Sequence, residues 1–212
     1  MQLPFTSEEF LKVFRNYNEA VFPMQIVFYL LALLAVYYTT RKKTVSDRLV
    51  TAILGFFWLW MGLAYHLLYF TSINKAAYLF GGVFILQGLL FLYVGIIGKQ
   101  LSFSYPGKTR GIVGALLITY ALIIYPVVGS LQGHAYPAGP TFGLPCPTTI
   151  FTFGLLLWAD RPVPKFILII PLLWSLIGFS AALTLGIKED YGLLLAGILA
   201  GVMIFWRKRS IA

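Results

Sequence analysis

Three side chains in this sequence could act as nucleophiles or as ligands of a soft metal, namely Cys146, His66 and His134. Thiolate and neutral imidazole bind zinc, copper and iron, and a Cys and His pair can carry out covalent catalysis. No two of the three have a metal-ligand spacing such as i and i+4, and no haem-attachment motif is present. The residue types therefore leave open a haem or metal bound through His66, His134 or Cys146, and an enzyme that uses Cys146.

Cys146 lies between Pro145 and Pro147, in a pattern typical of a helix start. Proline tolerates the first helical turn, where its missing N–H costs nothing, and it pre-sets the backbone dihedral. A helix that begins there would direct its free N–H groups, close to Thr148 and Thr149, toward an anion or a polarised oxygen. A lone cysteine in an apolar stretch also packs as a small hydrophobic residue, so a structural role for Cys146 stays open.

Polar residues within apolar segments complete the set of candidates. Such residues are costly in lipid unless they face another helix or a cavity. Ser, Thr and Gln also serve as packing contacts worth about 0.6 kcal/mol each, and a neutral imidazole can be buried in the same way. Because the polar residues concentrate toward one end of the segments, we expect a pocket there that comprises His66, Gln87, His134, Cys146, Thr148 and Thr149.

Seven long apolar segments must position these residues. A bilayer core of about 30 Å requires about 20 helical residues, and six of the segments approach that length. The fifth is short, so its first turns are expected to lie in the Pro-rich stretch that precedes it. The sequence thus predicts an all-α membrane protein, a seven-transmembrane helix bundle whose helices cover Val21–Thr40, Leu49–Thr71, Ala77–Ile97, Gly111–Gly129, Thr148–Ala159, Phe166–Gly186 and Tyr191–Trp206.

The 16 Lys and Arg residues assign the gaps between these segments to two sides. Four of them, Lys12, Arg15, Lys75 and Lys188, lie on one side, and the remainder lie in the alternate gaps. By the positive-inside rule the richer side is cytoplasmic, so the N-terminus is outside and the C-terminus is cytoplasmic. The cytoplasmic set comprises Arg41, Lys42, Lys43, Arg48, Lys99, Lys108, Arg110, Arg161, Lys165, Arg207, Lys208 and Arg209.

Composition excludes several classes of protein. With 59% hydrophobic and 11% charged residues the chain is far from a soluble globular average. The net charge of +9 is mostly next to the membrane, where insertion and anionic lipid contact explain it without nucleic acid. The single cysteine allows no disulfide within the chain.

Two further segments are expected on the outer side of a single integral membrane domain, residues 1–212. Residues 1–20 contain Ser7-Glu8-Glu9, an N-cap followed by acids, and predict a short amphipathic interfacial helix. Residues 130–147 are rich in Pro and Gly but too apolar for a solvated loop, and predict a folded cap. The triplet Lys188-Glu189-Asp190 is interpreted as a solvated outer turn.

Three stretches resemble a family of bacterial integral-membrane proteins catalogued only as a domain of unknown function. They are WLWMGLAYH at Trp58–His66, FTSINKAAYLF at Phe70–Phe80, and PTFGLPCPTTIFTFG at Pro140–Gly154, the most specific of the three. The resemblance spans nearly the whole chain and implies a location in the bacterial inner (cytoplasmic) membrane. Members of this family are sometimes loosely labelled permeases, and the resemblance implies no established activity.

The leading hypothesis is a protein that binds or transports a small neutral or weakly anionic molecule through an outward-facing pocket, since the expected pocket has dipoles and hydroxyls but no fixed acid. An accessory or redox subunit that holds haem or metal through His66, His134 or Cys146, and a membrane enzyme using Cys146, are the alternatives. The cofactor, if any, stays undefined. The expected partners are the lipid bilayer, a small-molecule ligand, and a further membrane subunit or a second copy of the chain.

Overall fold

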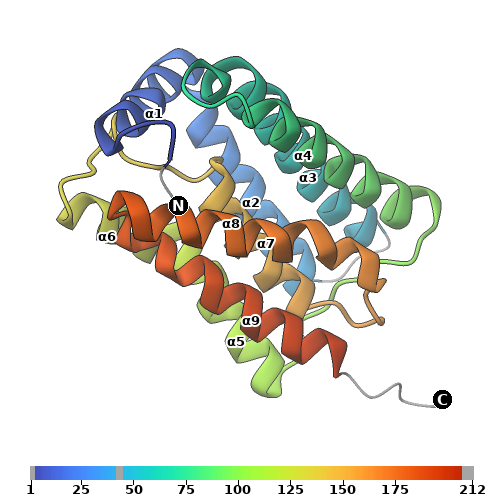
Figure 1. Cartoon of the computed structure of the whole chain (residues 1–212). Coiled ribbons are helices and arrows are strands. Elements are labelled where there is room, and N and C mark those ends of the chain that lie inside the picture. Colours follow the sequence, from blue (N-terminus) through green and yellow to red (C-terminus); the bar gives the residue numbers. More distant parts are fainter. Residues whose placement is uncertain (1–2, 42–44, 207–212) are drawn as a thin grey trace.

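The computed structural model describes residues 3–41 and 45–206, which fold into helices, as predicted, with two isolated β-bridges and no named strand (Figure 1). Short 3-10 and wider π-helical stretches, labelled η, continue or connect the α-helices. The elements are α1 Ser7–Val21, α2 Met24–Thr40, α3 Ser46–Trp60, η1 Met61–Tyr69, η2 Phe70–Ser72, α4 Ala77–Leu92, η3 Tyr93–Ile97, α5 Lys108–Thr119, η4 Tyr120–Ile124, α6 Tyr125–Leu131, α7 Pro145–Leu157, η5 Lys165–Leu168, α8 Ile169–Leu185, η6 Lys188–Asp190 and α9 Tyr191–Phe205.

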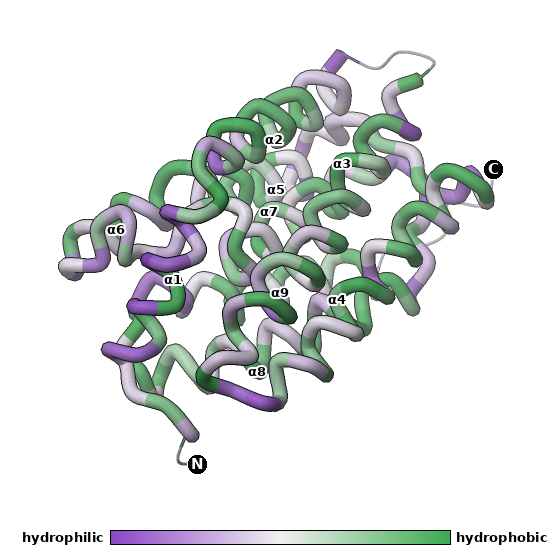
Figure 2. The backbone as a smooth tube through the Cα atoms, turned by 90° about the horizontal axis from the view of Figure 1, so that it is seen from above, coloured by the Kyte–Doolittle hydropathy of each residue, from purple (hydrophilic) through white to green (hydrophobic). Residues whose placement is uncertain are grey.

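Each of the seven predicted apolar ranges overlaps one of these helical rods, and the third has the predicted bounds Ala77–Ile97. Four rods are long and apolar enough to cross a membrane, and α1 with α2, bent by 84° at their junction, would be a fifth if taken as one broken span. Hydrophobic residues run along the rods, while hydrophilic residues gather near their ends and on α1 (Figure 2). This pattern indicates an integral membrane protein. The four rods are Ser46–Ser72, Ala77–Ile97, Lys108–Leu131 and Lys165–Leu185.

The short helix α7 lies at the centre of the molecule, and all but one of its 13 residues are buried. It begins at Pro145, which confirms that the Pro-rich stretch supplies its first turn. At its other end the Arg110 guanidinium donates hydrogen bonds to the carbonyl oxygens of Leu157, at 2.9 Å, and Ala159, at 2.6 Å. These bonds satisfy carbonyl groups that a helix end leaves without partners, so α7 can stop inside the protein.

Glycines let the rod of α3 and η1 lie closely against α4. A Cβ added at Gly62 would lie 2.8 Å from the carbonyl oxygen of Gly81, closer than side chains are found in proteins. Small residues at helix contacts are the usual way in which membrane helices approach, because lipid supplies no hydrophobic drive between them. Aromatic packing adds to this interface, where the Trp58 indole is stacked on the Phe84 ring at 4.6 Å between centroids.

Three rods contain wide π-helical turns, which the apolar pattern of the sequence does not predict. A π-helical turn holds more residues than an α-helical turn, so it rotates every side chain beyond it relative to a regular helix. The first of these turns, η1, contains Tyr65 and His66, and the third, η4, contains Tyr120 and ends next to Tyr125. Such turns often lie at functional sites, and here they set which side chains face the interior.

Helix α1 lies across the ends of the bundle, and the connection from Gln132 to Leu144 packs against it (Figure 1). Its N-cap is Thr6 rather than the predicted Ser7, because the Thr6 hydroxyl and the Glu9 carboxylate form a reciprocal capping box. The Asn18 amide donates hydrogen bonds to the carbonyl oxygens of Pro137, at 2.7 Å, and Gly139, at 2.9 Å. The Pro/Gly-rich connection is thus a folded segment fixed to α1.

Some predicted features lie outside the described residues. They are Met1 and Gln2 of the interfacial segment, the cytoplasmic Lys42 and Lys43, and the basic triplet Arg207, Lys208 and Arg209.

Candidate functional site

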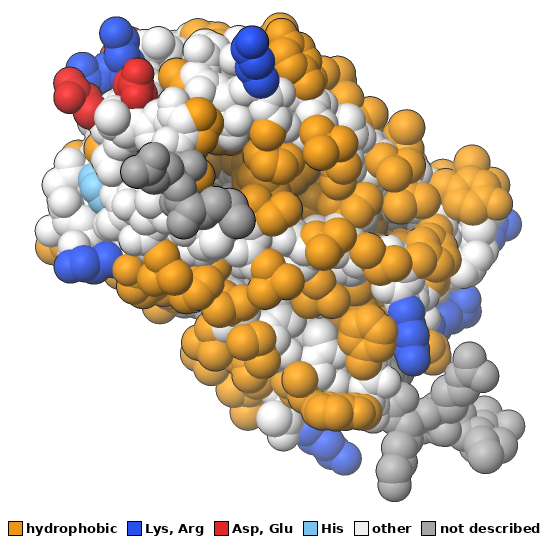
Figure 3. Space-filling model, viewed as in Figure 1, with side chains coloured by type: hydrophobic (Ala, Val, Ile, Leu, Met, Phe, Trp, Pro, Cys, Tyr) orange, Lys and Arg blue, Asp and Glu red, His pale blue; other side chains and the backbone are white. Residues whose placement is uncertain are grey.

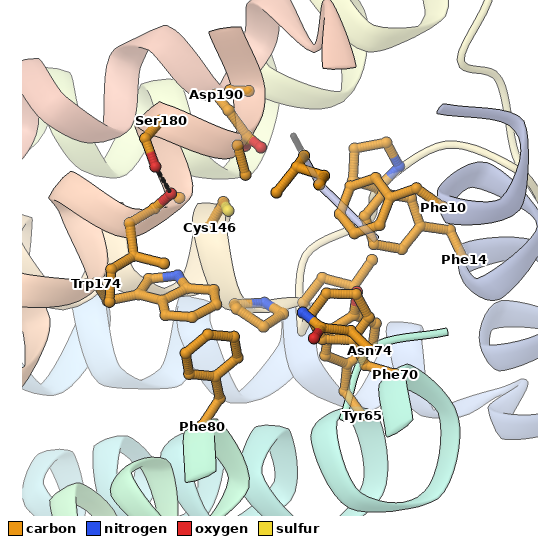
Figure 4. A pocket seen from close by; sticks show the side chains of 18 of the residues that line it. Phe10, Phe14, Tyr65, Phe70, Asn74, Phe80, Cys146, Trp174, Ser180 and Asp190 are labelled. Atoms are coloured by element: carbon orange, nitrogen blue, oxygen red, sulfur yellow. Dashed lines mark hydrogen bonds between the residues drawn. The ribbon is translucent and has the colours of Figure 1, made fainter. Parts of the chain in front are cut away.

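A cavity of about 440 Å³ lies between α1, α4, α8 and the start of α7. Most of its wall is apolar, and aromatic rings from four segments of the chain surround it (Figure 4). Helix α1 and the residues before it form one side, and α8 with the first residues of α4 forms the opposite side. We call this cavity the outer pocket, a name taken from the topology that the sequence predicts. Its aromatic wall consists of Phe5, Phe10, Phe14, Tyr65, Phe70, Phe80, Tyr125 and Trp174.

Polar groups meet at one end of the outer pocket, where α7 and α9 begin. Tyr125 donates its hydroxyl hydrogen to the Asp190 carboxylate, and the Cys146 thiol lies within hydrogen-bonding reach of the same carboxylate. Asp190 precedes α9 and is only 4% exposed. Burial raises the pKa of Asp190 to about 7, against the lowering effect of the hydrogen bonds from Tyr125 and Cys146.

Trp174, on α8, adds a hydrogen-bond donor to this polar end. The residue is 8% exposed, and its indole ring lines the pocket beside Cys146 (Figure 4). The indole N–H lies near the sulfur of Cys146 but makes no hydrogen bond of good geometry within the described part of the chain. Because indole can only donate, this N–H is available to an acceptor atom in the pocket.

The interpretation of Lys188-Glu189-Asp190 as a solvated turn is wrong for the two acids. Glu189 is fully buried and Asp190 nearly so, whereas Lys188 is exposed. A Glu189 carboxylate oxygen lies 2.9 Å from Nδ1 of His134, and the Tyr120 hydroxyl donates a 2.7 Å hydrogen bond to the Glu189 carbonyl oxygen. The link η6 between α8 and α9 is short, so it stays packed against the bundle. Residues from other segments contact it there and exclude solvent from the two acids.

The expectation of a pocket without a fixed acid is therefore also wrong, since Asp190 lines the cavity. Its position could have been suspected from the sequence. The chain has only seven acidic residues, and two of them lie directly before an apolar helix. Acidic side chains at that place are stabilised by the partial positive charge of the helix N-terminus. Tyr125 and Trp174 gave no comparable signal, because aromatic residues are abundant throughout the apolar segments.

Of the six candidate residues, Cys146 is the one that lines the outer pocket. His66 lies just behind its wall, and the centroid of its ring is 5.2 Å from that of Trp174 and 5.9 Å from that of Phe80, two residues that line the pocket. Both ring nitrogens of His66 are buried without a hydrogen-bond partner in the described structure. The aromatic rings thus separate the imidazole from the cavity, and His66 does not share a site with Cys146.

His134 lies away from the outer pocket, paired with Glu189 and lining a second cavity of about 220 Å³. This smaller cavity is formed by α6 and the connection that follows it. Glu189 and Asp190 are adjacent in the chain, at η6. Their carboxyl groups nevertheless contact different residues, His134 for Glu189, and Tyr125 and Cys146 for Asp190.

The remaining candidates make contacts within the bundle. The Gln87 amide donates a 3.1 Å hydrogen bond to the Ile167 carbonyl oxygen. The Thr148 hydroxyl accepts a 3.1 Å hydrogen bond from the backbone N–H of Gly143, where φ is +103°. Thr149 is fully buried and its hydroxyl has no partner in the described structure. None of these three side chains lines the outer pocket.

The proposed catalytic and metal chemistry can be compared with this geometry. A reactive thiolate is favoured by a nearby cation, but the group beside Cys146 is a carboxyl. Across residues 3–41 and 45–206, no three His, Cys, Asp or Glu side chains come close enough together to hold a metal ion. His66, His134 and Cys146 occupy three different places, so they do not form one ligand set.

Comparison with known proteins assigns the chain to a family but not to an activity. No curated protein and no solved structure matches it. One family model matches residues 7–212, which is nearly the whole chain and includes all three stretches that carried the resemblance. This chain belongs to the family of unknown function DUF6064.

Proposed function

We propose that residues 1–212 form one membrane domain of seven crossings, with the N-terminus outside and the C-terminus in the cytoplasm of a bacterial cell. The alternation of basic gaps supports this topology. The short α7 can serve as the fifth crossing because protein surrounds it, and folded backbone is tolerated at membrane depth where it is buried. In this arrangement the outer pocket lies in the outer half of the membrane.

A cysteine-accessibility experiment tests the topology. Lys108 and Lys188 are both exposed and should lie on opposite sides. In a variant without Cys146, a cysteine at position 188 should react with an impermeant maleimide on intact cells, and one at position 108 should react only after lysis. Equal labelling of both sites on intact cells would refute the seven-crossing arrangement.

Within this framework the protein binds a small molecule in the outer pocket, as a receptor or as a carrier. The observation that supports this function is the cavity itself, about 440 Å³, with apolar walls and a few convergent polar groups at one end. Sites for small ligands usually have this form, in which apolar contact supplies affinity and a few polar groups fix orientation. The acid at the polar end disfavours the weakly anionic ligands that the sequence suggested, and leaves neutral or cationic ones.

Filling the pocket should abolish binding. Ala181 lines the cavity on α8, and Ala181→Phe would occupy part of it, whereas Leu183→Phe changes a lipid-facing residue of the same helix. In thermal-shift screening of the detergent-purified protein against small amphiphiles, compounds that stabilise the wild type should stabilise Leu183→Phe equally and Ala181→Phe little. Equal stabilisation of all three proteins would exclude the outer pocket as the site.

An absorbance spectrum and metal analysis of the same preparation test the redox alternative. A Soret band or stoichiometric metal that disappears in a His66→Ala, His134→Ala variant would favour a haem-binding or metal-binding subunit over a ligand-binding protein.

A further inference from the structure

We infer that the outer pocket, in the binding role proposed above, selects membrane-soluble amphiphiles with a cationic ammonium head. The head lies against Asp190, and the apolar body lies among the aromatic rings. The ligand enters from the outer leaflet of the bilayer, between α4 and α8. Three features of the structure lead to this inference.

The first feature is the charge of the polar end. Asp190 accepts a hydrogen bond from the neutral Tyr125 hydroxyl and lies within reach of the neutral Cys146 thiol, and no Lys or Arg of the described residues forms an ion pair with it. The adjacent acid, Glu189, is instead paired with His134. A carboxylate buried without a cation is costly, and a cationic ligand would remove that cost while an anionic one would increase it.

The second feature is the aromatic lining. Phe80, Trp174 and Tyr65 present rings to the cavity from three different segments of the chain (Figure 4). The face of an aromatic ring attracts a cation, and cages of such rings recognise ammonium groups. The cavity thus has an acid at one end and aromatic rings along its wall. This combination favours binding of an ammonium head over binding of a bare alkyl chain or a carboxylate.

The third feature is the route into the pocket. Phe5, Phe10 and Phe14 cover it on the side of α1. Between α4 and α8 the surface is hollowed among hydrophobic side chains (Figure 3). Ile177, on α8, both lines the cavity and is 42% exposed, so the cavity reaches the surface of α8 beside apolar residues that face outward. An opening with an apolar rim on a membrane-spanning surface admits molecules from lipid more readily than from water.

Four ten-carbon probes with different heads test the charge selectivity: decylamine, decyltrimethylammonium, decanol and decanoate. Each is titrated at pH 8 into the full chain in an uncharged maltoside detergent, and binding is followed by quenching of tryptophan fluorescence and by thermal shift. For the wild type, half-saturation by the two cations should occur at concentrations at least tenfold lower than for decanol, with decanoate weakest. Decanol binding as tightly as decylamine would overturn the inference, and this comparison requires no variant.

Asp190→Asn should remove the preference for cations and leave decanol binding unchanged. Glu19→Gln is the matched control, because it removes one negative charge from an exposed position of α1 and should keep the preference. A cation preference that survives in Asp190→Asn would contradict the assigned role of Asp190. If Ala181→Phe weakens decanol and decylamine alike while the wild type does not distinguish them, the pocket function stands and the selectivity for ammonium fails.

The route is tested with two substitutions on neighbouring positions of α8. Ile177→Trp should narrow the opening and slow the uptake of decylamine from preloaded vesicles at least severalfold. Leu176→Trp places the same bulk on a residue that is 57% exposed and does not line the cavity, so uptake should keep its wild-type rate. Equal rates in the two variants would exclude access between α4 and α8.

Discussion

The Tyr125 hydroxyl donates a hydrogen bond to the carboxylate of Asp190, which links the rod of α5, η4 and α6 to the turn before α9. The two residues are 65 positions apart, and both side chains are buried. This bond closes the polar end of the outer pocket and holds the carboxylate beside Cys146.

Tyr125→Phe should destabilise the protein by about 1–3 kcal/mol, because it leaves a buried carboxylate oxygen without its phenol donor. Tyr78→Phe is the matched control, since Tyr78 is 64% exposed on α4, and it should change stability by less than about 0.5 kcal/mol. Urea or thermal unfolding in detergent, followed by tryptophan fluorescence, measures both. Equal stability of the two variants would show that the Tyr125 bond is worth little.

The stability of the wild type should fall as pH rises from about 5 to 8. The pKa of Asp190 is about 7 in the folded protein and 3.8 in the unfolded reference, so between these values the folded state binds more protons and stability decreases with pH. Asp190→Asn cannot ionise and should lose less stability over the same range. The difference between the two proteins isolates Asp190 from Glu189 and His134 nearby. If the stability of the two proteins changed with pH in parallel, the prediction of a raised pKa for Asp190 would be wrong.

His134→Ala should destabilise the fold by about 1–3 kcal/mol, because Glu189 is fully buried and would lose its imidazole partner. Lys188→Ala is the control. Lys188 precedes Glu189 in the chain, but its side chain is exposed, so its removal should change the stability little. Hydrogen exchange of the α8 to α9 connection should increase in His134→Ala alone. A neutral effect on both measurements would show that the His134 and Glu189 contact is dispensable.

Gly62→Ala should destabilise the contact between the α3 rod and α4 by about 1–3 kcal/mol, since the new methyl group would meet backbone atoms of Gly81 and Ile85 at under 3 Å. Gly82→Ala on the same interface helix is the control. Its methyl group meets nothing within 4 Å, so it should be neutral or slightly stabilising through reduced freedom of the unfolded chain. Thermal unfolding compares the pair, and the prediction fails if Gly62→Ala is as stable as Gly82→Ala.

The sequence by itself determined the helices and the family. Apolar runs of membrane length bounded by charged or Gly/Pro-rich gaps define where helices lie, which is why Ala77–Ile97 and the start of α7 at Pro145 could be predicted closely. The irregular stretch Pro140–Gly154 was specific enough to suggest the family, because hydrophobicity alone does not produce such a pattern. Both features are local, and neither depends on contacts between distant parts of the chain.

The tertiary structure decided which side chains share a site. His66 and Cys146 were expected together, but the imidazole packs behind the rings of Trp174 and Phe80 that line the pocket, and it does not itself line the cavity. Asp190, interpreted as solvated, became the acid of that pocket because Tyr125 and Cys146 meet it from other helices. Hydrophobic periodicity gives the apolar face of a helix but not its rotation against its neighbours, and the π-helical turns shift that rotation further. Contacts between helices far apart in the sequence therefore set the composition of the site.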